Sequence, residues 1–361
     1  MKSSGFLTSI LHPVLSLRSK PVRLAFCSTA LPKPQVPIYL RPPAFRAPLS
    51  ELKKWHNWAE DRASAVGSTF SDLDNGPDST LLHRELKWLV EDALEQPAAL
   101  LSPRSSGRIY GDDSPVPIRV CLDELYKLWT QRIEKRRPFQ YVVGCEHWRD
   151  LILSVEEGVL IPRPETETIV NLVEDAVKSN GELKNGVWAD LGTGSGALAI
   201  GIARVLGPAG GKVVGVDLSS VAVAVASYNV ERHNLQDRIS VRLGSWFDPL
   251  KDVVGELSGL VSNPPYIPSE DIEGLQAEVS RHEPRVALDG GANGMNHLIQ
   301  LWNGAALVLK SGGFFAFETN GEMQSKFLVD HMHSAVEGSF RNVSIVSDFA
   351  GIQRFVTGYR A

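Results

Sequence analysis

In the first half of the chain, apolar residues recur at helical spacing. Three stretches between residues 52 and 133 place an apolar side chain every three or four positions, the period of one helix face. The marking positions are Leu52, Trp55, Trp58 and Ala59, then Leu81, Leu82, Leu86, Leu89, Val90 and Leu94, and finally Leu122, Leu125, Leu128, Trp129 and Ile133. Loops at residues 71–79 and 97–117 separate them. We therefore predict a small helical domain over residues 51–137.

The hydrophobic period then shortens toward two. Tyr141 and Val143, and later Leu151, Leu153 and Val155, stand at alternate positions. Such alternation is typical of strands with one buried face. Residues 138–164 are therefore predicted to form a short β-hairpin connector that leads into the main domain.

Beyond residue 165, short apolar runs suited to buried strands alternate with helical stretches. The strand candidates are residues 187–191, 212–217, 239–243, 259–262, 314–318, 343–346 and 354–357. This alternation is typical of an α/β fold with a doubly wound, mostly parallel sheet. The last two candidates are separated by a short turn at Ala350 and Gly351, so we expect an antiparallel hairpin there. Residues 165–361 are thus predicted to form a Rossmann-like domain with seven strands.

The first 50 residues differ in composition from the rest. They contain seven Lys or Arg, several Ser and no Asp or Glu, and residues 31–48 are rich in Pro. A basic, acid-free start is typical of a mitochondrial or chloroplast transit peptide, and the Ser content favours the chloroplast. A disordered basic tail is the alternative. We expect residues 1–50 to be a transit peptide followed by a lead-in without regular structure.

Charge and cysteine content narrow the classes of function. Removing the seven basic residues of the first segment from the total of 37 leaves 30 against 42 acidic residues, a net charge of about −12. This disfavours a nucleic-acid surface. Cys121 and Cys145 lack zinc-ligand spacing, and His331 and His333 follow an apolar helical stretch, so no metal site is predicted. We also expect no membrane span and a monomer.

A glycine-rich loop follows the first predicted strand of the main domain. Residues 189–197 read Ala-Asp-Leu-Gly-Thr-Gly-Ser-Gly-Ala and lead into an apolar helix. Small residues there let a ligand approach backbone N–H groups, so we expect a nucleotide-like cofactor. The loop also fits the loose dinucleotide pattern G-x-G-x-x-G/A and cannot by itself separate NAD from S-adenosylmethionine. The predicted cofactor contacts are Asp190, Gly192, Thr193, Gly194, Ser195 and Gly196.

Asp217 ends the next predicted strand. An ionised carboxylate at that position is placed to accept hydrogen bonds from both hydroxyls of a ribose. The alternative role is a helix N-cap, but Ser219 and Ser220 are better placed to cap the helix that follows. Asp217 is therefore predicted to bind the cofactor.

The sequence Asn263-Pro264-Pro265-Tyr266 follows the fourth predicted strand, where an open α/β sheet presents its ligand crevice. Consecutive prolines leave the Asn263 side-chain oxygen and the Pro264 carbonyl as paired acceptors. Two acceptors can hold a planar NH₂ group, aim its nitrogen at a methyl sulfonium and favour the positive charge that grows there. Tyr266 would wall this slot. A plain Asn-Pro turn is the alternative.

These motifs and four further stretches resemble the HemK/PrmC-type release-factor glutamine methyltransferases, over about residues 81–360. The stretches are Arg-Pro-Phe-Gln-Tyr-Val-Val-Gly at 137–144, Leu-Ile-Pro-Arg-Pro-Glu-Thr-Glu at 160–167, His-Glu-Pro-Arg-Val-Ala-Leu at 282–288 and Asp-Phe-Ala-Gly-Ile-Gln-Arg-Phe-Val at 348–356. The resemblance implies a class I fold that uses S-adenosylmethionine. It also implies methylation of the glutamine in the Gly-Gly-Gln motif of bacterial-type release factors, here those of the organelle, which the helical domain would grip.

The resemblance also implies roles for single residues. Residues 192–196 would bind the methionine and ribose parts of the cofactor, Trp246 would flank adenine, and residues 263–266 would hold the glutamine, with Asn263 also next to the cofactor. Ser245 stands where many relatives have an acidic residue, so a hydrogen bond to the adenine amino group is not expected from it. Arg163 and Glu165 would line the pocket, with a salt bridge or a helix cap as the alternative. No residue is assigned as a catalytic base.

Two other functions fit part of the pattern. Adenine-N6 DNA methyltransferases share a related Asn-Pro-Pro-Tyr motif, because adenine also presents an NH₂ group on an sp² carbon. The acidic chain and the absence of a basic recognition segment disfavour them. A non-catalytic methyltransferase-like binding protein is compatible with the fold, although the motifs are intact. A dehydrogenase is disfavoured because the loop after the fourth strand offers no obvious proton donor.

Overall fold

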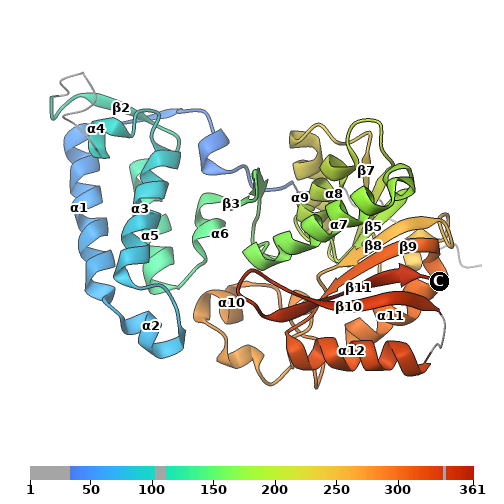
Figure 1. The fold of residues 1–361 in the computed structure, drawn as a ribbon. Helices are drawn as coiled ribbons and strands as arrows, with labels where there is room; N and C mark the ends of the chain where they lie inside the picture. Colours follow the sequence, from blue (N-terminus) through green and yellow to red (C-terminus); the bar gives the residue numbers. More distant parts are fainter. Residues whose placement is uncertain (1–32, 102–110, 336–338) are drawn as a thin grey trace, which may run out of the picture. The chain divides into compact units, whose positions relative to one another are not determined.

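The computed structural model describes residues 33–101, 111–335 and 339–361. Three long helices form the helical region and bury their apolar faces in one shared core (Figure 1). These are α1 (Leu49–Val66), α3 (Ser79–Ala93) and α5 (Leu122–Glu134). Trp55 and Trp129 lie fully buried in this core, and the Trp129 indole donates a hydrogen bond to the Ala59 carbonyl (3.0 Å). The three helices predicted from hydrophobic spacing are thus all present.

Part of the Pro-rich lead-in has regular structure, contrary to the expectation for residues 1–50. From residue 33 the chain forms the 3-10 helix η1 (Ile38–Leu40) and strand β1 (Phe45–Pro48), which pairs antiparallel with β2 (Pro115–Ile118). Ile38 and Ala47 are buried against the helical core, which anchors the segment. Proline is tolerated because both strands of a two-stranded ribbon are edge strands. The expected transit peptide up to residue 32 lies outside the described residues.

Three short helices lie where none was predicted. They are α2 (Thr69–Asp74), α4 (Ala98–Leu101) and α6 (Phe139–Val143). In α6, four of the five side chains are buried, so apolar residues lie on nearly all sides of this short helix. Its sequence therefore shows no helical period and can be mistaken for a strand. Gly144 ends this helix in the left-handed conformation (φ 83°). The predicted hairpin follows, in β3 (Cys145–Trp148) and β4 (Leu151–Ser154).

Seven strands form the main sheet, in the order β10-β11-β9-β8-β5-β6-β7. Their bounds are β5 (Val187–Leu191), β6 (Val213–Asp217), β7 (Ile239–Leu243), β8 (Leu257–Ser262), β9 (Leu309–Glu318), β10 (Phe340–Ser347) and β11 (Gln353–Arg360). Strands β5 to β9 run parallel, whereas β11 pairs antiparallel with both β9 and β10. The predicted mostly parallel sheet with a C-terminal hairpin is confirmed.

Helices cover both faces of this sheet, and a separate buried core lies on each side. One face packs against α7 (Glu167–Ser179), α8 (Ala197–Leu206) and α9 (Ser220–Arg232), and the other against α11 (Asn296–Val308) and α12 (Glu322–Ala335) (Figure 1). The connections contain α10 (Ala277–His282) and the 3-10 helices η2 (Pro164–Thr166), η3 (Gly181–Asn185), η4 (Asp248–Leu250), η5 (Ile272–Gly274) and η6 (Arg285–Ala287). Among the described helices, none has both the length and the apolar character needed to cross a bilayer.

The order of the strands determines where a ligand can bind. Strand β5 lies between β6 and β8, so the chain leaves β5 toward one edge of the sheet and later returns to its other side. Loops that leave the carboxyl ends of β5 and β8 therefore diverge, and a crevice opens between them. The glycine-rich loop and the Asn-Pro-Pro-Tyr motif are the two segments that follow these strands.

Close packing between the neighbouring strands β5 and β8 leads to a first prediction. Gly259 of β8 lies against the fully buried indole of Trp188 on β5, and an added Cβ would overlap that ring. Gly259→Ala should lower the free energy of unfolding by about 1–3 kcal/mol, as overpacking of a core does. Urea denaturation followed by circular dichroism would measure this change.

Gly181→Ala is the matched control. A Cβ at Gly181 meets no described atom within 4 Å, and its backbone is not left-handed. Its unfolding midpoint should stay at the wild-type value. Equal midpoints for Gly259→Ala and Gly181→Ala would show that the β5–β8 contact tolerates an added methyl group.

Candidate active site

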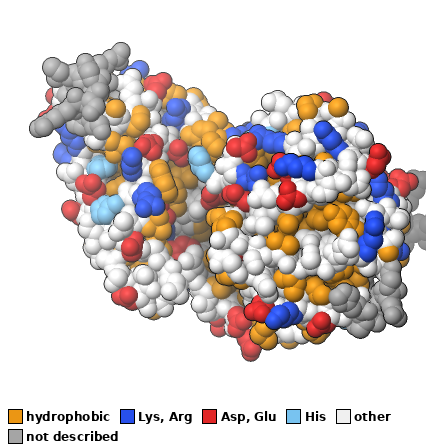
Figure 2. Space-filling model, in the orientation of Figure 1, with side chains coloured by type: hydrophobic (Ala, Val, Ile, Leu, Met, Phe, Trp, Pro, Cys, Tyr) orange, Lys and Arg blue, Asp and Glu red, His pale blue; other side chains and the backbone are white. Residues whose placement is uncertain are grey.

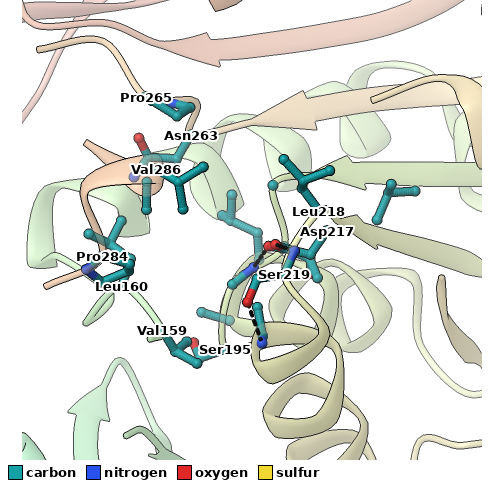
Figure 3. A pocket seen from close by; sticks show the side chains of 18 of the residues that line it. Val159, Leu160, Ser195, Asp217, Leu218, Ser219, Asn263, Pro265, Pro284 and Val286 are labelled. Carbon is teal, nitrogen blue, oxygen red and sulfur yellow. Dashed lines mark hydrogen bonds between the residues drawn. The ribbon is translucent and has the colours of Figure 1, made fainter. Parts of the chain in front are cut away.

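A cavity of about 290 Å³ lies at the carboxyl edge of the sheet. Successive strands contribute to its wall through Gly192 to Ser195 after β5, Asp217 at the end of β6, Trp246 after β7 and Asn263 after β8. Figure 3 shows Asn263 and Val286 on one side of the pocket and Asp217 with Ser219 on the other. The lining is mainly apolar with a few polar groups, which is typical of a small-molecule site.

The glycine-rich loop takes a shape that other residues disfavour. Gly192, Gly194 and Gly196 all have left-handed backbones, with φ of 75°, 55° and 83°. A Cβ is strained in this region, so glycine is favoured at each position. Gly196 is the N-cap of α8 and lies next to the cavity-lining residues Ser195 and Ala197. The loop therefore brings the positive end of a helix to the cavity wall.

Asp190 supports this loop from behind and does not line the cavity. Its carboxylate is fully buried and accepts hydrogen bonds from the Thr193 hydroxyl (2.6 Å) and the Ala199 N–H (3.0 Å). Burial raises the pKa of Asp190 to about 7, although the hydrogen bond from Thr193 opposes the shift. Sequence reasoning grouped Asp190 with the cofactor contacts, whereas its contacts in the structure hold the loop.

Asp217 faces the cavity and also orients the loop. Its two carboxylate oxygens accept hydrogen bonds from the backbone N–H groups of Gly194 and Ser219, both at 2.9 Å. A carboxylate has about four acceptor positions, so it retains capacity for ligand hydroxyls. Burial raises the pKa of Asp217. The N-cap of α9 is Ser219, which accepts from the Ala222 N–H (3.3 Å), so the preference for serine as the cap is confirmed.

Trp246 forms part of the cavity wall after β7. Its backbone is left-handed (φ 42°), and its indole lies 5.4 Å from the imidazole of His297, measured between ring centroids. His297 also lines the cavity, at the start of α11. Ser245 lines it as well and offers only a hydroxyl. The sequence carried no signal for His297, because only the packing of α11 brings it to this site.

A second cavity of about 270 Å³ adjoins the first, and Asn263 lines both. Pro264 and Tyr266 line the second cavity, whereas Pro265 lines the first. The structure therefore brings Asn263, Pro264 and Tyr266 together as predicted and turns Pro265 toward the expected cofactor. Leu275, Gln276 and Val279, from the segment around α10, also line the second cavity.

The Asn263 amide is held in one orientation by residues that sequence reasoning did not assign. Its Nδ2 donates to the Thr166 hydroxyl (3.1 Å), which itself donates to Glu318 Oε2 (2.7 Å). The Tyr266 hydroxyl donates to the other oxygen of Glu318 (3.0 Å). Within the described chain, no group donates to Asn263 Oδ1. Thr166 directly precedes α7, and Glu318 ends β9 at the edge of the sheet where ligands bind. These positions are the signal that could have identified the two residues.

Arg163 and Glu165 occupy different surroundings. Arg163 lines the second cavity and pairs with buried Glu283 (2.6 Å), so it combines the two roles that were left open. Glu165 lies 3.6 Å from Arg354 and lines neither cavity. Glu283 also accepts a hydrogen bond from the Ile161 N–H (3.3 Å). This pairing ties the connector to the segment that follows α10.

The wall of the second cavity is fastened to the helical region by buried charges. Glu278 of α10 accepts hydrogen bonds from Arg132 (2.9 Å) and from Arg136 (2.7 and 2.5 Å). Glu85 and Asp74 pair with the same two arginines. Burial opposes ionisation of Glu278, but the hydrogen bonds and charges of the arginines outweigh it and lower its pKa. The helical region thus helps to position a wall of the site.

The described residues contain no cluster of His, Cys, Asp and Glu that could hold a metal ion. On the face in Figure 2, Lys and Arg side chains lie among Asp and Glu and form no continuous basic surface. Besides apolar side chains, the linings of the two cavities offer backbone groups, hydroxyls, amides, aromatic rings, the Asp217 carboxylate and the Arg163 guanidinium.

Comparison with known proteins gives matches over most of the chain. The release factor glutamine methyltransferase of Synechocystis sp. is 34% identical over 309 residues, which cover 85% of this chain and 95% of that protein. Those of Thermosynechococcus vestitus and Gloeobacter violaceus are 39% and 40% identical and cover 67% and 68% of this chain and 80% and 82% of theirs. The family profile of ribosomal protein L11 methyltransferase (PrmA) matches residues 164–263.

The buried charge cluster predicts a strong effect on stability. Glu278→Ala removes the acceptor shared by the buried Arg132 and Arg136, whose charges stay paired with Glu85 and Asp74. The unsatisfied guanidinium donors should cost about 1–3 kcal/mol of unfolding free energy. Because the pKa of Glu278 is lowered by folding, its contribution is complete above the unfolded value of 4.5 and is lost as the pH falls below it. Urea denaturation at pH 7 would measure the change.

Glu273→Ala in η5 is the control for this substitution. Glu273 is exposed and belongs to the same connection as Glu278, so its loss should change stability by less than about 0.5 kcal/mol. If Glu278→Ala were as stable as this control, the cluster would not fasten α10 to the helical region.

Proposed function

Because the chain belongs to the release factor glutamine methyltransferases, we propose that it transfers a methyl group from S-adenosylmethionine to a glutamine side-chain amide nitrogen in a peptide-chain release factor. The sheet order and these relatives identify the predicted class I S-adenosylmethionine-dependent methyltransferase fold. The proposed target is the glutamine of the Gly-Gly-Gln motif, as the resemblance of the sequence implies.

The residues of the first cavity fit this cofactor. An apolar wall and the Trp246 indole suit adenine, the Asp217 carboxylate suits ribose hydroxyls, and the left-handed turn at Gly192 to Gly196 brings backbone close to a ligand. When bound, the cofactor supplies an electrophilic methyl group on a positively charged sulfur. We assign Gly192, Thr193, Gly194, Ser195 and Gly196 to its methionine and ribose parts.

One observation supports the proposed reaction above the others, namely the place and orientation of the Asn263 amide. Asn263 lines both cavities, and its NH₂ group donates a hydrogen bond to the Thr166 hydroxyl. Its Oδ1 therefore remains to accept a hydrogen bond from the NH₂ of a substrate amide, and the Pro264 carbonyl can accept the second. Two acceptors orient the nitrogen and stabilise the positive charge that develops on it during methyl transfer.

The second cavity is the proposed glutamine slot. Tyr266 walls it, and Arg163 lines it with a charge that Glu283 neutralises. The segment around α10 forms another part of the wall and is held by the helical region through Glu278. We assign the grip on the release factor to that helical region, so a docked partner would contact the same elements that position the slot.

Transfer to adenine in DNA is less well supported. Its chemistry would suit the same pair of acceptors, but the relatives with more than two thirds of their length matched are protein-glutamine methyltransferases by name. The mixed charges of the surface in Figure 2 also offer no continuous basic track for a phosphate backbone. A purely binding role is disfavoured by the complete set of acceptors around Asn263.

The proposed site of action is the chloroplast, with the mitochondrion as the alternative. The first 50 residues contain seven basic and no acidic residues, and three relatives that match over most of their length come from cyanobacteria, the lineage from which plastids descend. The substrates would then be the bacterial-type release factors of that organelle. We propose that the enzyme acts as a monomer.

The reaction is tested by radiolabelled methyl transfer from S-adenosylmethionine to a purified organellar release factor. Label should depend on the glutamine of Gly-Gly-Gln and disappear when it is changed to alanine. Asn263→Ala should lower kcat by about 100-fold to 1,000-fold, because a preorganised acceptor is lost, while the affinity for the cofactor stays within about threefold. Calorimetric titration with S-adenosylhomocysteine would measure that affinity.

Asp217→Ala gives the opposite pattern and serves as the reciprocal control. Its main effect should be a cofactor affinity at least tenfold weaker, since the ribose loses its acceptor. Near-wild-type turnover in Asn263→Ala would exclude the clamp, and unchanged affinity in Asp217→Ala would exclude the ribose contact. Label on the release factor without the Gly-Gly-Gln glutamine would exclude the proposed target.

The proposed chloroplast localisation predicts the outcome of an import experiment. Residues 1–50 fused to a fluorescent protein should direct it into the chloroplasts of a plant cell, because the segment is basic and free of acidic residues. The same fusion with its seven Lys and Arg changed to Gln is the control and should stay outside. Fluorescence in mitochondria would instead support the alternative organelle, and diffuse fluorescence would contradict a transit peptide.

A further inference from the structure

The side-chain amide of Asn263 fits its place in two orientations that differ by a half turn. One presents Oδ1 to the second cavity, and the other presents the NH₂ group there. Only the first can accept a hydrogen bond from a substrate amide. Since both have nearly the same shape, packing alone cannot choose between them, and the choice depends on the hydrogen-bond partner of the amide.

That partner is the Thr166 hydroxyl, which has a single proton. Thr166 uses this proton in its hydrogen bond to Glu318 Oε2 (2.7 Å), so toward Asn263 it can act only as an acceptor. The group of Asn263 that faces Thr166 must therefore be the NH₂ group. The direction of the donor at Thr166 thus determines the orientation of the amide.

Glu318 determines the direction of the donor at Thr166. Its Oε1 accepts from the Tyr266 hydroxyl (3.0 Å) while its Oε2 accepts from Thr166, so both oxygens act as acceptors, as in an ionised carboxylate. A neutral carboxyl group would carry a proton of its own and would have to donate to one of these two hydroxyls. One hydrogen bond of the chain would then be lost or reversed.

We propose that Glu318 is a positioning residue for methyl transfer, whose buried carboxylate acts through Thr166 to hold the Asn263 amide with Oδ1 toward the target slot. The same carboxylate holds the hydroxyl of Tyr266 at the wall of that slot. This assignment rests on the proposed function, because the slot is defined there by its glutamine substrate.

The surroundings of Glu318 disfavour an ionised carboxylate, so its presence there calls for a functional reason. Glu318 is fully buried at the end of β9 and is held by two neutral hydroxyls. The charge of Arg354 on β11 acts on Glu318, but this arginine pairs instead with Asp348 (2.8 Å) and Glu165 (3.6 Å). A buried charge without a direct ion pair is strongly disfavoured, and an apolar residue would suit this core better.

These surroundings also predict that Glu318 titrates near neutral pH. Burial raises its pKa to about 7, and Glu165 adds to the shift, whereas the hydrogen bonds from Thr166 and Tyr266 and the charge of Arg354 oppose it. Because the ionised form is the one that orients the amide, kcat should fall as the pH is lowered through this value. Asp190 titrates in the same range under the cofactor loop, so a variant must separate the two groups.

The test uses the full chain with three single substitutions, one at Glu318 and two at Thr166. Glu318→Gln keeps the size of the side chain but replaces an acceptor by a donor, and Thr166→Val removes the hydroxyl. Each should lower kcat for the release factor by about 10-fold to 100-fold, with KM and cofactor affinity within about threefold of wild type. Thr166→Ser retains the hydroxyl and should restore most of the activity. Glu322→Gln, an exposed carboxylate close to the end of β9, is the matched control.

Two further readouts separate positioning from a general structural role. The double variant Glu318→Gln with Thr166→Val should be no slower than the worse single variant, because both act on one path. The acidic decrease in kcat at saturating cofactor should be absent in Glu318→Gln. Wild-type kcat in Glu318→Gln, an unchanged acidic decrease, or a loss of activity that only follows lost cofactor affinity would each overturn the proposal.

A measurement without substrate decides the inference even if the proposed function fails. The side-chain NH₂ signals of Asn263 in an NMR spectrum can be assigned by their loss in Asn263→Asp. They should shift between pH 6 and 8 in the wild type, about one unit to either side of the Glu318 pKa, and stay in place in Glu318→Gln. An identical titration in both proteins would show that Glu318 does not control the amide. Absence of methyl transfer by the wild type would exclude the release factor as substrate. The NMR titration would still show whether Glu318 controls the Asn263 amide.

Discussion

A buried hydrogen bond from the Ser262 hydroxyl to the Leu191 carbonyl (2.6 Å) joins the carboxyl ends of β8 and β5. The rest of the site depends on these two strand ends being adjacent. The residue after each of them, Asn263 in one case and Gly192 in the other, begins a loop that lines the first cavity. Since parallel strands end at the same edge of a sheet, the cofactor loop and the substrate motif meet there although 71 residues separate the bonded pair.

Buried carboxylates around this edge are stabilised in two different ways. Glu278 is neutralised by two arginines, and its pKa is lowered. Asp190 and Glu318 accept hydrogen bonds from hydroxyl and N–H groups without a direct cation, and burial raises the pKa of each to about 7. Glu278 therefore stays ionised near neutral pH and holds the α10 wall of the second cavity. Asp190 and Glu318 can gain or lose a proton in the same pH range.

The chemistry of the site depends on the loop that follows β8 more than on the glycine-rich loop. A turn of small residues at a helix N-terminus suits several nucleotide-like cofactors, so its presence alone leaves the reaction open. Asn263 and Pro264 line the second cavity, and their oxygens are the acceptors proposed for the NH₂ group of the substrate. The helical region holds α10, whose segment also lines the second cavity, through hydrogen bonds from Arg132 and Arg136 to Glu278.

The sequence by itself determined the long elements and the order of the motifs. Helices α1, α3 and α5 followed from their helical periodicity, because a face that packs on a core repeats with the period of the backbone. The seven strands of the main sheet followed from short apolar runs, because a strand covered on both faces is apolar throughout. Short elements such as α6 and β1 were missed, since α6 is buried on nearly all sides and shows no helical period, and β1 lies in a Pro-rich stretch. Only the tertiary structure decided that Thr166 and Glu318, 152 residues apart, are joined by a hydrogen bond and that Thr166 accepts one from the Asn263 amide. Hydrogen bonds of that kind depend on distances set by the packing of the whole sheet, and no local pattern records them.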